Sequence, residues 1–98
     1  MSTPRARECR LDVSELEAPE PLFIALDALD ALQAGEYLHL IHRREPYPLY
    51  AHLLERQCAW RILRNGAGVY EALLWHLSDP LASAACAASH DNPLSGSC

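Results

Sequence analysis

The chain has 98 residues, of which 50% are hydrophobic, and a net charge of −5. This length suits one small domain, and the negative charge argues against a nucleic-acid partner, because phosphate binding depends on clustered cations. No apolar run reaches the roughly 18 residues that cross a membrane, and the N-terminus lacks the apolar stretch of a signal peptide. We therefore expect a cytoplasmic protein that contacts no membrane.

Hydrophobic periodicity predicts six regular elements after a flexible N-terminal segment at residues 1–8. In chain order these are a strand at 9–13, a helix at 21–33, a strand at 36–42, a helix at 47–57, and strands at 58–64 and 69–77. A strand, a helix and a second strand in this order imply a right-handed crossover with the two strands parallel. We therefore predict an α+β fold, a two-layer α/β sandwich of order β-α-β-α-β-β with two helices on one face of a four-stranded mixed sheet.

Residues 79–98 form a segment dominated by Ala, Ser, Pro and Asn, with few large apolar side chains to bury. We expect a disordered C-terminal tail here, with at most a transient helical turn at 81–89. The folded domain is accordingly assigned to residues 9–78.

The last two strands are joined by a hairpin turn at 65–68, where Asn and Gly residues tolerate positive φ. We take Arg64 to pair with Val69. This register puts Trp60 and Trp75 on one face of the hairpin. Only one sheet face can meet the two helices, so the other is expected to expose an apolar patch, which makes it a candidate surface for a homodimer.

Parallel pairing of the first two strands brings the starts of both helices to the same edge of the sheet. The segments 19–21 and 43–47 should therefore be neighbours in space. Helix N-termini attract anions, and two adjacent arginines can clamp a carboxylate or phosphate group, so a small anionic ligand or a protein partner is expected. The predicted binding site consists of Glu20, His42, Arg43, Arg44, Glu45 and Tyr47. In the alternative interpretation, the two glutamates simply neutralise the two arginines.

The sequence contains no recognisable catalytic constellation. All 8 basic residues are arginine, as expected from a GC-rich bacterial genome, so no lysine can act as a nucleophile. The four cysteines lack the spacing of a zinc site, and His39 and His42 point to opposite faces of their strand. We expect a non-enzymatic protein with no catalytic residue, no metal site and no cofactor.

The order of elements, together with Leu11-Asp12-Val13, Pro19-Glu20-Pro21 and Gly35-Glu36, resembles the TusA/SirA-like family of small sulfur-carrier proteins over about residues 10–77. In that family a Cys-Pro-x-Pro motif begins the first helix, and its cysteine accepts a persulfide. The same position is Ala18 in this chain. The resemblance therefore implies the fold without the nucleophile.

A second motif, Glu45-Pro46-Tyr47-Pro48-Leu49-Tyr50, is similar to that of a cysteine-less branch of this superfamily described as a domain of unknown function. The resemblance implies a TusA-like binding or accessory module linked to redox or nitrogen-oxide metabolism. Many relatives have Gly-Phe after the second helix, where this chain has Gln57-Cys58. Two alternatives stay open: a sulfur carrier that uses Cys58 or Cys9 instead, and an interaction protein that oligomerises through the open sheet face.

Overall fold

The computed structural model describes residues 6–89, which form a four-stranded sheet with three helices. In chain order the elements are β1 (Arg7–Asp12), α1 (Glu20–Asp30), β2 (Glu36–His42), α2 (Tyr47–Glu55), β3 (Cys58–Gly66), β4 (Val69–His76) and α3 (Pro80–Ser89). The first six elements follow the predicted order, and α3 is an addition to it. No helix within residues 6–89 has the length and apolar character needed to cross a membrane.

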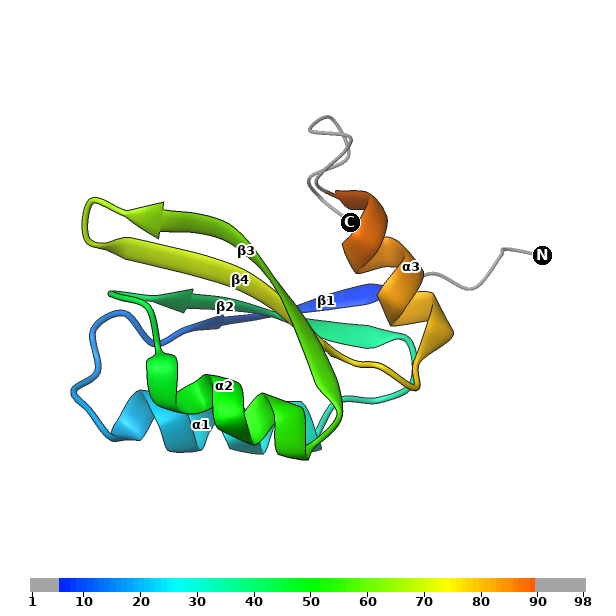
Figure 1. The fold of residues 1–98 in the computed structure, drawn as a ribbon, viewed down its shortest axis with the longest axis horizontal. Helices are drawn as coiled ribbons and strands as arrows, with labels where there is room; N and C mark the ends of the chain where they lie inside the picture. Colours follow the sequence, from blue (N-terminus) through cyan, green and yellow to red (C-terminus); the bar gives the residue numbers. More distant parts are fainter. Residues whose placement is uncertain (1–5, 90–98) are drawn as a thin grey trace.

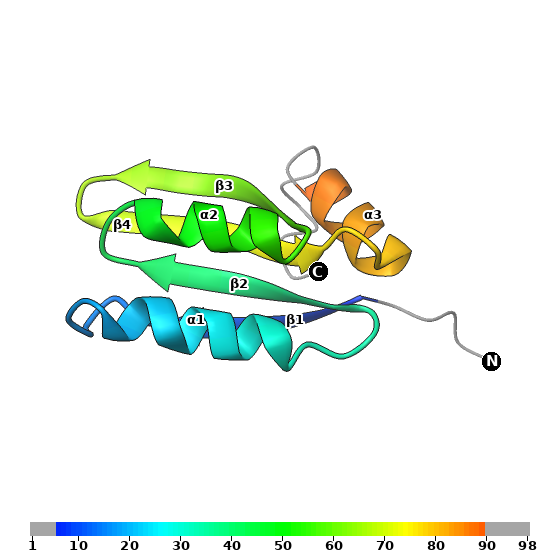
Figure 2. The same ribbon diagram turned by 60° about the horizontal axis from the view of Figure 1, so that its bottom comes forward.

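The strands lie side by side in the order β1-β2-β4-β3. β1 runs parallel to β2, whereas β4 is antiparallel to both of its neighbours. α1 and α2 lie on the same side of the sheet (Figure 1), and both begin at the same end of the molecule (Figure 2). The predicted α+β fold with a four-stranded mixed sheet is confirmed.

Each of these two helices buries one apolar stripe against the sheet, as expected for a helix with one face in the core. The buried side chains are Ala25, Leu26 and Leu29 on α1 and Leu49 and Leu53 on α2. The strands meet them with Leu38, Leu40, Tyr70, Ala72 and Leu74. Pro21 and Pro48 lie in the first turns of the helices, where proline removes an N–H group that has no intrahelical partner.

α3 covers part of the opposite face of the sheet (Figure 1). Its side chains Ala82 and Cys86 are buried in a second apolar cluster with Tyr37, Leu73 and Trp75. The small side chains let the helix lie close to the large ones beneath it. Both faces of the sheet therefore carry helices, whereas the sequence predicts an open second face.

The disordered tail predicted for residues 79–98 is wrong over 80–89, because Asp79 and Pro80 begin a helix. Asp79 Oδ1 accepts a hydrogen bond from Ala82 N at 3.1 Å, while Oδ2 accepts one from Gly35 N at 2.6 Å. An Asp followed by Pro is a typical helix start, and alanine is the strongest helix former. The remainder of the predicted tail, 90–98, lies outside the described residues, as do residues 1–5 of the predicted flexible N-terminus.

A β-bulge in β3 decides which face Trp60 occupies. The register with β4 shifts just before Arg64, which pairs with Glu71 instead of its predicted partner. Trp60 consequently faces α2, where its ring stacks on that of Tyr50 at a centroid distance of 4.8 Å. The prediction that Trp60 and Trp75 share a face is wrong, because one extra residue in a strand reverses the alternation of its side chains.

Beyond α3, charged and polar side chains lie on this second face. His39 Nδ1 is 3.1 Å from Glu8 Oε2, and His39 Nε2 is 2.8 Å from Glu71 Oε1. These contacts join β1, β2 and β4 through side chains. Trp75 is only 8% exposed beneath α3, so the side chains that suggested an apolar dimer surface are covered.

We predict that Ala82→Asp lowers the free energy of unfolding by about 2 kcal/mol, because a carboxylate would be forced into the apolar cluster under α3. Ala84→Asp, at an exposed position of the same helix, should change it by less than about 0.5 kcal/mol. Urea unfolding followed by tryptophan fluorescence measures both. Equal midpoints for the two variants would contradict the docking of α3.

Gln57 ends α2 with a backbone φ of 56°. This left-handed conformation is costly for residues that carry a Cβ atom and is the usual place for glycine. The following residue, Cys58, is buried. Gln57-Cys58 thus keeps the left-handed helix end that a glycine would form more easily, and the backbone is strained at Gln57.

Gln57→Gly should raise the free energy of unfolding by about 0.5–1 kcal/mol, because it relieves this strain. Ala51→Gly, at an exposed position inside α2, should lower it by a similar amount, about 0.5–1 kcal/mol. Thermal unfolding monitored by circular dichroism compares the two. A lower midpoint for Gln57→Gly than for the unmodified chain would refute the explanation.

Candidate functional site

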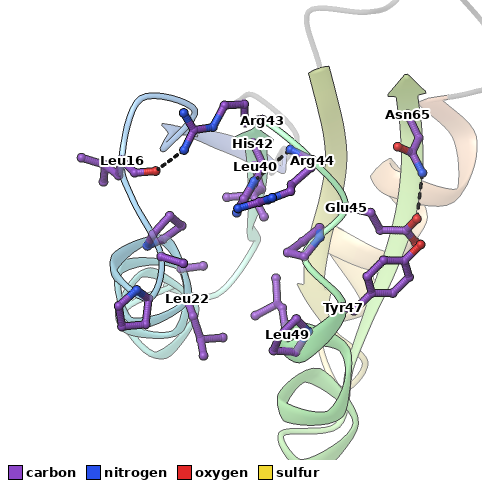
Figure 3. A pocket seen from close by; sticks show the side chains of 16 residues that line it. Leu16, Leu22, Leu40, His42, Arg43, Arg44, Glu45, Tyr47, Leu49 and Asn65 are labelled. Atoms are coloured by element: carbon purple, nitrogen blue, oxygen red, sulfur yellow. Dashed lines mark hydrogen bonds between the residues drawn. The ribbon is translucent and has the colours of Figure 1, made fainter. Parts of the chain in front are cut away.

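The starts of α1 and α2 flank a pocket of about 660 Å³ (Figure 3). Its apolar part is formed by Leu16, Leu22, Ala25, Leu40 and Leu49. Ala18, Pro19 and Pro21 contribute one wall, and the segment 42–48 contributes the other together with Asn65. The two segments predicted to be neighbours are brought together here, because β1 and β2 are parallel and end at the same edge.

Prolines limit what the backbone can offer to a ligand at this edge. Pro19, Pro21, Pro46 and Pro48 all line the pocket, and proline has no N–H group. The N–H groups of Glu20, Leu22, Tyr47 and Leu49 donate to backbone carbonyls at 2.9–3.1 Å. The helix starts therefore offer few free N–H donors, so polar recognition depends on side chains.

Arg43 holds the loop between β1 and α1. Its Nη2 donates a hydrogen bond to the carbonyl oxygen of Leu16 at 3.2 Å and lies 3.5 Å from Glu17 Oε2. Figure 3 shows the side chain extended toward Leu16. This arginine thus fixes one wall of the pocket.

Arg44 reaches over the pocket beside His42 (Figure 3). Within residues 6–89, its guanidinium has neither a hydrogen bond nor an ion pair, while its backbone N donates to His42 Nδ1 at 3.2 Å. Burial, followed by the charges of Arg44 and Arg43, lowers the pKa of His42 below its ordinary 6.5. The ring is therefore neutral at pH 7, with its proton on Nε2.

Glu45 ties the start of α2 to the rest of the fold. Its Oε1 accepts from Asn65 Nδ2 and its Oε2 from the Tyr50 hydroxyl, both at 2.8 Å. The Tyr50 oxygen lies 2.8 Å from the hydroxyl of buried Tyr70. Both carboxylate oxygens are engaged inside the protein, and within residues 6–89 Glu45 forms no ion pair with either arginine.

The two remaining predicted site residues differ in position. Tyr47 lines the pocket, is 69% exposed and packs edge-on against Tyr50, with ring centroids 6.3 Å apart. Glu20 lies in the first turn of α1, outside the pocket lining, and within residues 6–89 it pairs with neither arginine; Arg43 pairs with Glu17 instead. Sequence reasoning missed Asn65, which its turn composition marks only as a hairpin residue.

Each of the two thiols considered for sulfur transfer has a raised pKa. Cys58 is 2% exposed, and burial raises its pKa. Burial, followed by the charge of Glu36, raises the pKa of Cys9. The thiolate is the reactive form of cysteine, and both environments disfavour it. No group of three or more His, Cys, Asp or Glu side chains in the described part of the chain is arranged to hold a metal ion.

Glu45→Gln should reduce the free energy of unfolding only at pH values above the ordinary carboxyl pKa. The hydrogen bond from Tyr50, with those from Asn65 and Tyr47, lowers the pKa of Glu45 below 4.5 against the opposing effect of burial. A lowered pKa contributes stability above the unfolded value, and this contribution is lost as the pH falls through the folded value. The difference in urea midpoint between the two proteins should thus be constant near neutrality and shrink below the ordinary carboxyl pKa.

Glu15→Gln, which changes an exposed carboxylate outside the pocket lining, is the matched control for this measurement. It should leave the urea midpoint nearly unchanged at both ends of the pH range. A Glu45→Gln difference that does not vary with pH would contradict the role given to its hydrogen bonds.

Comparison with known proteins places this architecture in a family. A family model described as an uncharacterized conserved protein, DUF2249, matches residues 10–76, from β1 to the end of β4. This range includes every residue that lines the pocket, whereas α3 lies beyond it. Searches of curated proteins and of solved structures returned no significant match. Since the model covers more than half of the sequence, the chain belongs to the uncharacterized conserved protein family DUF2249.

Proposed function

We propose that this protein is a non-catalytic binding module that holds a small organic molecule in the pocket between the starts of α1 and α2. The observation that carries the proposal is the pocket itself, a cavity of about 660 Å³ with an apolar floor and polar groups on one wall. Sites for small molecules are concave, mostly apolar, and enclose about 300–1,000 Å³. The pocket has both the size and the composition of such a site.

The groups that line the pocket support binding rather than chemistry. Ala18 occupies the position at which the resembling sulfur carriers have their cysteine, and the lining contains no thiol. Its one carboxylate, Glu45, is held by Asn65 and Tyr50, and its one hydroxyl is that of Tyr47. A general base or nucleophile would need a free, activated group within reach of the ligand.

The TusA-like resemblance and the suggested place beside redox or nitrogen-oxide enzymes rest on the sequence motifs. In this proposal the protein is a cytoplasmic accessory module that carries or senses a metabolite instead of a persulfide. The loss of the thiol at Ala18 and the unfavourable environments of Cys58 and Cys9 support this choice over sulfur transfer.

Filling the pocket tests the proposal. Ala18 is exposed and lines the pocket, so Ala18→Trp should block it without disturbing the core. Ala51→Trp, at an exposed position of α2 outside the lining, is the matched control. A library of neutral, anionic and cationic fragments is screened by NMR against the ¹⁵N-labelled chain.

Fragments that bind are expected to shift the amide signals of Leu16, Leu22 and Leu49 in the unmodified chain and in Ala51→Trp. They should leave Ala18→Trp unaffected at the same concentrations. The proposal fails if no fragment shifts these signals, or if the hits bind Ala18→Trp as well as they bind the control.

A further inference from the structure

We infer that the ligand of this pocket is a carboxylate with an apolar body, and that its head group is bound by the guanidinium of Arg44 and the Nε2–H of His42. The inference rests on the proposed function and adds the chemical class of the ligand. It also gives the two adjacent arginines different roles. Arg44 binds the ligand, whereas Arg43 holds the β1–α1 loop that forms one wall of the pocket.

The free polar groups of Arg44 and His42 on the pocket wall are donors. The Arg44 guanidinium has no partner within residues 6–89, and the His42 ring uses Nδ1 to accept the Arg44 backbone N–H, which leaves Nε2–H to donate. The acceptors of Glu45 are both occupied. A head group made of acceptors, without donors of its own, fits this wall.

The charge at the wall suits one negative charge rather than two. Arg43 is compensated by Glu17 at 3.5 Å, and His42 is neutral at pH 7. Arg44 is then the one uncompensated cation of the segment 42–45, because the Glu45 carboxylate is turned toward Asn65 (Figure 3) and bound there. A guanidinium binds a carboxylate through two parallel hydrogen bonds, whereas a phosphate dianion would bring a second negative charge that no free cation of this segment compensates.

The floor determines the rest of the ligand. Leu22 on α1 and Leu49 on α2 lie on either side of the pocket (Figure 3), and Leu16 and Leu40 also line it. No charged side chain belongs to this part of the lining. An aliphatic or aromatic body would bury apolar surface here while the head group stays at the wall.

The experiment uses four eight-carbon probes that share one body: octanoate, octanol, octylamine and octyl phosphate. Their dissociation constants for the full chain are measured at neutral pH by NMR titration. Octanoate is expected to bind roughly ten- to a hundredfold more tightly than octanol, the range for hydrogen bonds to a charged group. Octylamine is expected to bind more weakly than octanol, because Arg44 repels it.

Arg44→Gln and Arg43→Gln are the matched variants. Arg44→Gln should reduce octanoate binding to the level of octanol and leave octanol binding unchanged. Arg43→Gln should keep the preference for octanoate, because its guanidinium holds Leu16 and Glu17 instead of the ligand. Circular dichroism verifies that both variants are folded, as expected for exposed side chains.

The outcomes separate this inference from the proposed function. Equal binding of octanoate and octanol, or an octanoate preference that survives Arg44→Gln, overturns the carboxylate assignment while the pocket remains a binding site. Tightest binding of octyl phosphate overturns it in favour of a phosphorylated ligand. If none of the four probes binds and the fragment screen also finds no binder, both proposals are overturned.

Discussion

Parallel pairing of β1 with β2 is the constraint on which the candidate site depends. The register from Arg7 opposite Glu36 to Asp12 opposite Ile41 aligns the two strands along their whole length. Their carboxyl ends therefore meet, and the chain leaves both strands side by side before it turns into α1 and α2 on the same face. The pocket is the space between these two turns. Its existence thus depends on backbone hydrogen bonds between segments that are distant in sequence, whereas its chemistry depends on a few side chains in the turns themselves.

Four prolines lie at the ends of these turns and in the first turns of α1 and α2, and they limit how the site could recognise a ligand. Anion sites at helix starts ordinarily use backbone N–H groups, which are fixed in place by the fold. Here those groups are missing or already paired, so the recognition that we propose depends on Arg44 and His42. The chain of hydrogen bonds from Tyr70 through Tyr50 to Glu45 and Asn65 then keeps the opposite part of the wall rigid. Under this proposal, a change of one side chain on the β2–α2 turn would alter the ligand without altering the fold.

Local patterns were sufficient to predict most of the fold. The bounds of β2 agree with the prediction because Gly35, at a φ of 82°, ends the preceding turn where the apolar pattern begins. The predicted site also contains five residues that line the pocket. Which arginine is free could not be predicted, because that depends on how the β1–α1 loop approaches Arg43. The sheet face that Trp60 occupies depends on one inserted residue in β3. The docking of α3 depends on an apolar surface that forms only when the strands have assembled into the sheet.

The bulge in β3 has a consequence for the outer border of the sheet. β3 is a terminal strand, and one of its sides has no neighbouring strand among residues 6–89. Such a side can hydrogen-bond to an extended segment of another molecule and start aggregation. The register shift between Ile62 and Arg64 interrupts the regular spacing of its N–H and C=O groups, and Arg61 and Arg64 place positive charge beside the interruption. An incoming strand would meet mismatched groups and bulky charged side chains, so the inserted residue that turns Trp60 inward also discourages growth of the sheet from chain to chain.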